Sequence, residues 1–390
     1  MTTRLFRDAT VLDADGAREA SVLVEDDRIT HVGAEPDGVD PDEVHHVDGD
    51  YLVPGLVDAH VHVMMDAGPN PAADIDRTTA DLTFRAARNL RAARDAGVTT
   101  VRDLGAADGI ALAARRAVDE EVVPGPRVLA CGQNVVMTGG HGHWFGREAD
   151  GCDEVTKAAR EQLKAGADVV KCMATGGVLT EGADTGGPEL TAAELGALVE
   201  AASAKGVPTA AHAHGKQGIE NAVAAGIDSV EHATYMDEAA AAAMADAGTY
   251  WVPTASALHG IVDNADDERI PGWAVEKAKD ARDAFEDAFS HALGADVTIA
   301  MGTDAGTPYN TFADIPRELE FMVEYGMTPT EALEAATATA ADLLGVDAGR
   351  IESDSAADLL VLSTDPRDDV TAWRDPETVC VRGRITGPSA

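Results

Sequence analysis

The sequence is short of several residue types, and each shortage excludes a class of protein. The 390-residue chain has four cysteines, Cys131, Cys152, Cys172 and Cys380, with no CxxC pair among them. A disulfide framework is therefore excluded, and reduced cytosolic thiols are expected. Aromatic residues make up only 4% of the chain, which favours tightly packed helices over an aromatic binding surface.

Long apolar runs are also missing. No segment approaches the ~18 consecutive apolar residues needed to cross a bilayer. The N-terminal stretch MTTRLFRDATVLDADG has no basic region followed by an apolar one, so it does not read as a secretion signal. We therefore expect a soluble, cytoplasmic protein without a membrane partner.

Positive charge is scarce. The chain carries 30 Lys and Arg against 69 Asp and Glu, a formal net charge of −39. Phosphate binding needs clustered basic side chains, so this charge excludes a nucleic-acid partner. Acidic runs such as residues 263–268 and 365–369 resemble those of proteins from salt-accumulating cytoplasms, where the Debye length is ~3 Å or less. The acidity thus indicates a halophilic habitat and carries no information about the substrate.

The order of short elements predicts the architecture. Residues 1–53 read as strands separated by Gly and Asp turns, and residues 346–390 return to strands. Between them, residues 54–345 alternate apolar strand-like segments with helical ones, as βα repeats around a parallel sheet do. We predict an α/β fold: a (β/α)₈ TIM barrel over 54–345 and a small composite β-sandwich formed by 1–53 and 346–390.

Eight strand segments can be recognised in the middle region, the number that the barrel requires. They lie near residues 56, 98, 127, 167, 208, 229, 249 and 297. Helical periodicity lies between them at 79–96, 153–165, 191–205, 237–247 and 273–293, and a last helix is expected over 328–344. The longest loops, 66–76 and 175–188, follow strand ends, on the side where such barrels carry their chemistry.

Histidines recur at the ends of these strands. His60 and His62 end the first strand, and because side chains at i and i+2 face the same way, both can touch one ion. His212 and His214 repeat this spacing in AAHAHG, and His232 ends the next strand in SVEHATY. Any one of them could be a core histidine, but five strand-end positions among twelve histidines favour a metal site.

A lysine and an aspartate complete this pattern. Lys171 ends the apolar strand segment VVKCM in a chain with only seven lysines, and a buried ammonium there must be paired or neutralised. Lys171 either extends to solvent or, with a lowered pKa, reacts with carbon dioxide to give a carbamate that bridges two cations. Asp304 ends the last strand segment in MGTDAG, where a carboxylate can bind metal and exchange a proton with bound water.

The segments VPGLVDAHVH, VVKCMATGG, HAHG, SVEHATY and MGTDAG resemble the amidohydrolase superfamily over nearly the whole chain. They are most similar to its imidazolonepropionase-related branch, which includes Xaa-Pro and Xaa-Arg/Lys dipeptidases and ochratoxinase-like amidases. The resemblance implies two divalent metal ions, which suit zinc but also manganese, cobalt or iron. It also implies a small-molecule substrate and assembly as a homo-oligomer.

The same resemblance assigns roles to single residues. It implies His60 and His62 on the first metal, His212 and His232 on the second, and Lys171 as a bridging carbamate. Asp304 would bind the first metal and act as the catalytic proton shuttle. His212 is preferred over His214 on its strand only because of the resemblance, which leaves His214 as an adjacent or substrate-binding residue.

The resemblance further implies substrate contacts in two glycine-rich loops and one strand end. A TGGHG loop like that at 138–142 is found in relatives, which places His141 and Tyr235 against the substrate's α-carboxylate. The second TGG, formed by Thr175, Gly176 and Gly177, would line the pocket. From the residues alone, the alternatives are a surface turn for the glycines and a packing role for Tyr235, and substrate contact is favoured over them.

Three functions are open at this stage. The first is a binuclear amidohydrolase for a small substrate with a free carboxylate, such as an Xaa-Pro or Xaa-Arg/Lys dipeptide or an N-acyl amino acid. The second is a cyclic-amide hydrolase of the imidazolonepropionase type, a mononuclear variant by resemblance, which Lys171 disfavours. The third is a non-catalytic barrel scaffold, which is disfavoured because all six ligand positions hold competent residues.

Overall fold

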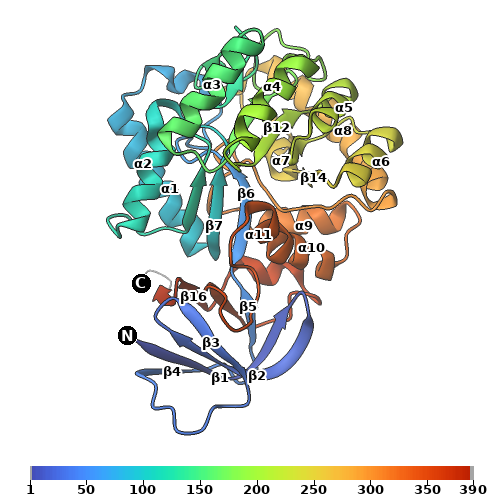
Figure 1. Cartoon of the computed structure of the whole chain (residues 1–390). Coiled ribbons are helices and arrows are strands. Elements are labelled where there is room, and N and C mark those ends of the chain that lie inside the picture. Colours follow the sequence, from blue (N-terminus) through green and yellow to red (C-terminus); the bar gives the residue numbers. More distant parts are fainter. Residues whose placement is uncertain (1, 387–390) are drawn as a thin grey trace.

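The computed structural model describes residues 2–386 and consists of a large α/β body joined to a smaller sheet (Figure 1). Residues 387–390, which the sequence assigns to the composite β-unit, lie outside the described residues. Within the described part of the chain, no helix is both long enough and apolar enough to cross a membrane.

Both ends of the chain build the smaller unit. Its strands form one hydrogen-bonded sheet, in which β5 of the N-terminal part pairs antiparallel with β15 of the C-terminal part. Figure 1 shows the blue and red segments side by side there. One apolar cluster that includes Phe6, Val22, Leu359 and Cys380 holds the two ends together. The strands are β1 (Thr3–Asp13), β2 (Gly16–Glu25), β3 (Arg28–Gly33), β4 (Glu43–His46), β5 (Tyr51–Pro54), β15 (Leu359–Leu362), β16 (Thr378–Val381) and β17 (Arg384–Thr386).

The larger unit is the predicted barrel, and its strands pair only in parallel. The main strands are β6 (Leu56–Val61), β7 (Val98–Asp103), β8 (Arg127–Ala130), β11 (Val170–Met173), β12 (Thr209–Ala213), β13 (Ser229–His232) and β14 (Tyr250–Val252), with the short β9 (Val135–Val136) and β10 (Arg147–Glu148) beside β11. The sequence-based fold class, an α/β barrel with a flanking sheet-rich unit, is confirmed.

The eighth barrel segment differs from the expected strand. Residues near 297–305 form isolated bridges to both neighbours, Trp251 with Ile299 and Val61 with Ala305. The Ala59 N–H also donates to the Met301 carbonyl at 2.9 Å. A left-handed backbone at Asp304 (φ 59°) interrupts the extended conformation that a ladder needs. The segment therefore closes the barrel with irregular backbone and turns Asp304 out of the strand direction.

Helices surround the barrel, and their starts follow local capping rules. Thr78, Thr191 and Thr328 each form a capping box with an acidic residue three positions later. The helices are α1 (Thr79–Asp95), α2 (Ile110–Asp119), α3 (Cys152–Ala165), α4 (Ala192–Ser203), α5 (Lys216–Ala225), α6 (Glu238–Ala247), α7 (Ala255–Asp263), α8 (Gly272–Gly294), α9 (Arg317–Glu324), α10 (Pro329–Ala336) and α11 (Ala338–Leu344), with 3₁₀ turns η1 (Pro71–Asp76), η2 (Ala107–Gly109) and η3 (Val370–Arg374).

The single helix predicted over 328–344 is wrong, because the structure divides it at Thr337. Thr337 has φ −129° and ψ −92°, outside the helical region, and separates α10 from α11. Its hydroxyl donates to the Leu333 carbonyl at 2.7 Å. This local bond competes with the helix ladder, a habit of threonine that periodicity alone does not reveal.

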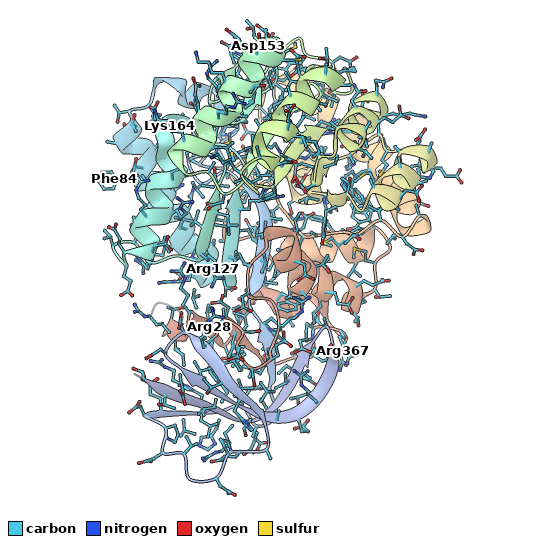
Figure 2. The ribbon with its side chains drawn as sticks, viewed as in Figure 1. Arg28, Phe84, Arg127, Asp153, Lys164 and Arg367 are labelled. Carbon is cyan, nitrogen blue, oxygen red and sulfur yellow. The ribbon has the colours of Figure 1, made fainter. Side chains whose placement is uncertain are left out.

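The two units are joined by a buried charge. Asp358, which is 1% exposed and lies beside β15, accepts a hydrogen bond from Arg127 of β8 at 3.1 Å. Figure 2 shows Arg127 at the junction between the barrel and the sheet. The junction lies at the amino ends of the barrel strands, so the smaller unit leaves their carboxyl ends free for the site described next.

Candidate metal centre

The structure gathers the predicted metal ligands around one cavity at the carboxyl ends of the barrel strands. Asp304 Oδ1 lies 3.2 Å from His62 Nε2 and 3.4 Å from His60 Nε2, without the directionality of a hydrogen bond to either. The rings of His212 and His232 lie 4.6 Å apart. All six side chains are buried and line the cavity: His60, His62, Lys171, His212, His232 and Asp304.

Backbone conformation decides how His232 reaches this cluster. Glu231 bonds to His60, so the next residue in a regular strand would face away from that side. His232 instead has φ 70° and the following Ala233 φ 46°, both left-handed. This sparsely populated conformation lets two consecutive side chains serve one site, and such strain concentrates at functional sites.

In each histidine, one ring nitrogen is hydrogen-bonded to the protein and the second is left for a metal. His60 Nδ1 faces Glu231 Oε2, and His62 Nδ1 faces the Gly105 carbonyl, both at 2.9 Å. These oxygens only accept, so Nδ1 carries the proton and Nε2 the lone pair. Burial and the nearby Lys171 lower the pKa of His60 to about 4. The pKa of His62 rises instead, because Asp304 outweighs burial.

The same reasoning applies to the second pair. His212 Nε2 lies 3.3 Å from the Gly176 carbonyl, which leaves Nδ1 with the lone pair. His232 Nδ1 lies 2.6 Å from Thr254 Oγ1, whose own proton goes to the Pro253 carbonyl. Thr254 therefore accepts from His232, and Nε2 of His232 stays available. Burial lowers the pKa of both histidines well below the ordinary value, which favours neutral imidazoles.

Two buried atoms of the cluster have no hydrogen-bond partner among the described residues. Lys171 Nζ and Asp304 Oδ1 are fully enclosed and unpaired, although such groups normally find a partner. Burial lowers the pKa of Lys171, which favours the neutral amine. Buried ligand atoms without a hydrogen bond fit a bound cation, and in two triads the ligand atoms lie within 4.8 Å of one another: His212, His214 and His232, and His60, His232 and Asp304.

Sequence analysis missed the group that orients His60. Glu231 is fully buried and accepts from His60 Nδ1 at 2.9 Å, from Arg102 at 3.1 Å and from the Ser229 hydroxyl at 2.6 Å. Burial alone would raise the pKa of Glu231, but Arg102 and His60 outweigh it and bring it to about 2. A carboxylate that holds a ligating histidine is a frequent feature of metal sites. The available signal was a glutamate inside a barrel strand, directly before His232.

His141 and His214, two of the predicted substrate-binding residues, line the cavity. The space beside them, counted out into the open solvent at the cavity mouth, is about 690 Å³. His141 is held from two sides: Glu189 accepts its backbone N–H, and Thr180 Oγ1 lies 2.8 Å from Nδ1. His214 Nδ1 lies 2.7 Å from a threonine hydroxyl at the end of β13. Each ring thus has Nε2 left for another partner.

The other predicted substrate contacts do not line the cavity. Tyr235 is half-buried with its ring beside Gly186. Thr175 and Gly176 lie behind His214 and His212, to which they are hydrogen-bonded. Gly177 lies against the His141 ring, where an added Cβ would be 2.4 Å from Cε1. Thr175, Gly176 and Gly177 thus contact the site histidines and not the cavity itself, and the contact of all four residues with substrate stays a prediction.

Comparison with known proteins agrees with this geometry. Residues 51–386 of this chain match the model of the family described as "Amidohydrolase family". Ochratoxinase of Aspergillus niger is 31% identical over 94% of this chain and 82% of its own, and imidazolonepropionase of Micrococcus luteus is 28% identical over 90% of each. A prolidase solved with N-methylphosphonate-L-proline superposes with a TM-score of 0.93 at 28% identity over the full length of both chains.

Proposed function

Because the chain belongs to the amidohydrolase family and is a hydrolase of carbon–nitrogen bonds, we propose that it cleaves the amide bond of a small substrate bearing a free carboxylate, with two divalent metal ions. The observation that carries the proposal is the convergence of six buried metal-ligating side chains, among which Lys171 Nζ and Asp304 Oδ1 have no hydrogen-bond partner within the described residues. Dipeptides such as Xaa-Pro or Xaa-Arg/Lys and N-acyl amino acids are the candidate substrates.

The donor set suggests which residues hold the ions. His60, His62 and Asp304 would hold one, His212 and His232 the other, and Lys171 both. Zinc suits this mixture of imidazole and carboxylate, with manganese, cobalt or iron as alternatives. Two such ions, when bound, provide hydroxide at neutral pH and polarise the substrate carbonyl.

Lys171 is proposed to bridge as a carbamate. The neutral amine that its burial favours would attack carbon dioxide, forming an Nζ–C bond and releasing one proton. The resulting carboxylate offers two oxygens where the amine offers one nitrogen. This step also resolves an otherwise unpaired buried amine.

Asp304 is proposed as the proton shuttle. Its Oδ1 faces the cavity beside His60 and His62 and has no hydrogen bond that would have to break. A carboxylate in that place takes a proton as the amide carbon is attacked and gives it to the leaving nitrogen. His141 is proposed to receive the substrate's carboxylate through Nε2, since Thr180 occupies Nδ1.

The relatives support a substrate with a free carboxylate. The compound bound in the prolidase structure, N-methylphosphonate-L-proline, is a derivative of proline, which carries a free carboxylate. Similarity to imidazolonepropionase keeps a cyclic amide as the contrasting case. A bridging Lys171 favours the open-chain amide, since the cyclic-amide enzymes resemble a mononuclear variant.

A substrate panel tests the proposal. Xaa-Pro, Xaa-Arg and N-acyl amino acids would be assayed beside their C-terminal amides, with imidazolonepropionate and lactones as contrasts. Loss of one charge-assisted hydrogen bond costs about 1.5 to 3 kcal/mol, so the amides should react roughly tenfold to a hundredfold more slowly. Equal cleavage of free and amidated forms, or turnover of the cyclic compounds alone, would refute the assignment.

A further inference from the structure

In the cavity over the candidate metal centre, ionisable and apolar side chains come from different parts of the fold. The ionisable side chains come from strand ends and from His141, whereas the loops beyond the strands and helix α7 supply an apolar wall. This wall includes Met65, Trp144, Phe145, Leu179, Leu258 and Ile261. A substrate whose amide reaches the strand ends must lay its side chains against this wall.

Charge is almost absent from the lining, although the chain is highly acidic. Of 69 Asp and Glu in the sequence, Asp304 is the one that lines the cavity within the described residues, and it already faces His60 and His62. No arginine lines it there, and its one lysine is Lys171. A guanidinium or ammonium on a substrate side chain that lies against this wall would lose its hydration without meeting a free carboxylate.

We infer that this site selects amides flanked by uncharged, apolar side chains and discriminates against cationic ones. The inference rests on the proposed function and narrows its substrates, because it favours apolar Xaa-Pro dipeptides and N-acyl derivatives of apolar amino acids over Xaa-Arg/Lys. The discrimination comes from an unpaired buried charge, so it should be large: on the order of a hundredfold in kcat/KM.

Two matched series test the selectivity: N-acetyl derivatives of leucine, arginine and glutamate, and the dipeptides Leu-Pro, Arg-Pro and Glu-Pro. Leucine members are expected to be cleaved on the order of a hundredfold faster than arginine or glutamate members. Comparable rates for leucine and arginine would overturn the inference while leaving the amide hydrolase intact. Cleavage of none would refute the proposed function, and calorimetry of the same compounds would then rank the side chains by affinity. Equal affinity, or no binding, overturns the inference.

A charge placed in the wall provides the reverse experiment. Leu258→Asp puts a carboxylate on α7 where Leu258 now lines the cavity. Leu258→Asn is the control, because asparagine has the shape of aspartate without its charge. The first variant should shift preference towards the arginine substrates by about tenfold or more relative to the second. Identical preferences in two folded variants would contradict the inference. If either variant fails to fold, the wild-type series still decides.

A different observation concerns the loop over residues 174–191, here called the covering loop. Lys277 of α8 donates to three backbone carbonyls of this loop, those of Gly177 at 3.3 Å, Thr180 at 2.8 Å and Ala183 at 2.5 Å. Its ammonium also lies 5.4 Å from the centre of the Trp273 ring. All three donors of one ammonium are thus used on a single loop.

Two backbone hydrogen bonds close the covering loop at its base. Gly176 N–H donates to the Gly187 carbonyl and Glu189 N–H to the Ala174 carbonyl, at 3.0 and 2.9 Å. Turns, with no helix or strand, occupy the stretch between. That stretch carries Leu179 of the apolar wall and Thr180, whose hydroxyl faces His141 Nδ1. The loop therefore sets both a wall of the cavity and the direction of His141.

We propose that Lys277 is a positioning residue that holds the covering loop over the cavity. Lys277 is not among the residues that line the cavity, and it acts through the loop backbone. Charge-assisted bonds to three carbonyls are among the stronger restraints available to a loop. Without them the loop should open more often, which exposes its backbone and loosens the apolar wall.

Lys277→Met tests this role, and Lys279→Met is its matched control, because Lys279 lies two residues further on the same helix and is exposed. Lys277→Met should be cut within 177–187 about tenfold faster by subtilisin, with bound metal unchanged. Its preference for N-acetyl-leucine over N-acetyl-alanine should fall because KM for N-acetyl-leucine rises. Lys277→Arg, which keeps the charge, should restore most of the protection.

A merely structural lysine would give a different result. It would lower the melting temperature without changing the loop's cleavage rate relative to other sites or the leucine preference. That outcome, or an equal effect from Lys279→Met, would overturn the proposal. The proteolysis readout needs no substrate, so it decides the role of Lys277 even if the proposed function fails.

Discussion

Replacing Glu231 with glutamine should disable the candidate centre while changing almost no volume. Glu231 uses one oxygen for His60 Nδ1 and the other for Arg102 and Ser229. An amide has one accepting oxygen, so its NH₂ must face either His60 or Arg102. If it faces His60, the imidazole has to accept at Nδ1, which moves the proton to Nε2 and removes the lone pair meant for the metal.

The other orientation is equally costly. An NH₂ directed at Arg102 leaves a guanidinium that is 2% exposed without its counter-charge. Breaking a buried ion pair by removing one partner typically costs about 3 to 5 kcal/mol. Losing the carboxylate behind a ligating histidine typically costs about tenfold to a hundredfold in metal affinity or activity. We expect Glu231→Gln to lose both stability and metal.

Three measurements separate these effects: urea unfolding of the metal-free protein, metal affinity by competition with a chromophoric chelator, and kcat/KM with the best amide of the panel. Ser229→Ala is the control, since it removes a neutral partner of the same carboxylate and should cost about 1 kcal/mol at most. If Glu231→Gln keeps metal affinity and kcat/KM within about twofold of wild type, the tautomer argument is wrong.

Three further predictions concern the bridge, a buried acid and the surface. Lys171→Ala should abolish activity and lower bound metal, with rescue by a short-chain acid; full activity and metal content would refute the carbamate. Burial raises the pKa of Glu318 to about 7, although hydrogen bonds from Ser256 and Ala255 act to lower it. The unfolding free energy should therefore fall by ~3 kcal/mol in all as the pH rises from ~4.5 to ~7. The unfolding free energy of Glu318→Gln, measured by denaturation, should lack this dependence on pH. The charge of −39 should make the melting temperature fall in dilute buffer; an unchanged value from dilute buffer to molar potassium chloride would refute the salt-adapted interpretation.

Much of the fold followed from local pattern. The predicted helices at 79–96 and 153–165 match α1 and α3 to within a residue, because apolar period and capping residues are properties of short segments. The two misses were also local in cause. Thr337 divides the last helix through a side-chain bond, and left-handed Asp304 breaks the eighth strand, and neither changes the apolar pattern.

The site was partly predictable for the same reason. His60 and His62, and likewise His212 and His214, stand two residues apart at strand ends, and that position places them at one rim of a barrel. His232 and Asp304 were predicted at the same rim from their positions, although a left-handed backbone orients both. Tyr235 and the segment Thr175–Gly177 were expected at the substrate; they are not among the residues that line the cavity, and their contact with substrate stays a prediction.

The sequence by itself determined the alternation of elements, the strand-end positions of the donors and the acidity of the surface, because each depends on residues close together in the chain. The tertiary structure decided which nitrogen of each imidazole is free, since the partners come from distant segments. Glu231 meets Arg102 across 129 positions and His60 across 171. Lys277 reaches the Gly177 carbonyl across 100. Contacts of that range exist only once packing has brought the strands and helices together, so no local period in the chain encodes them.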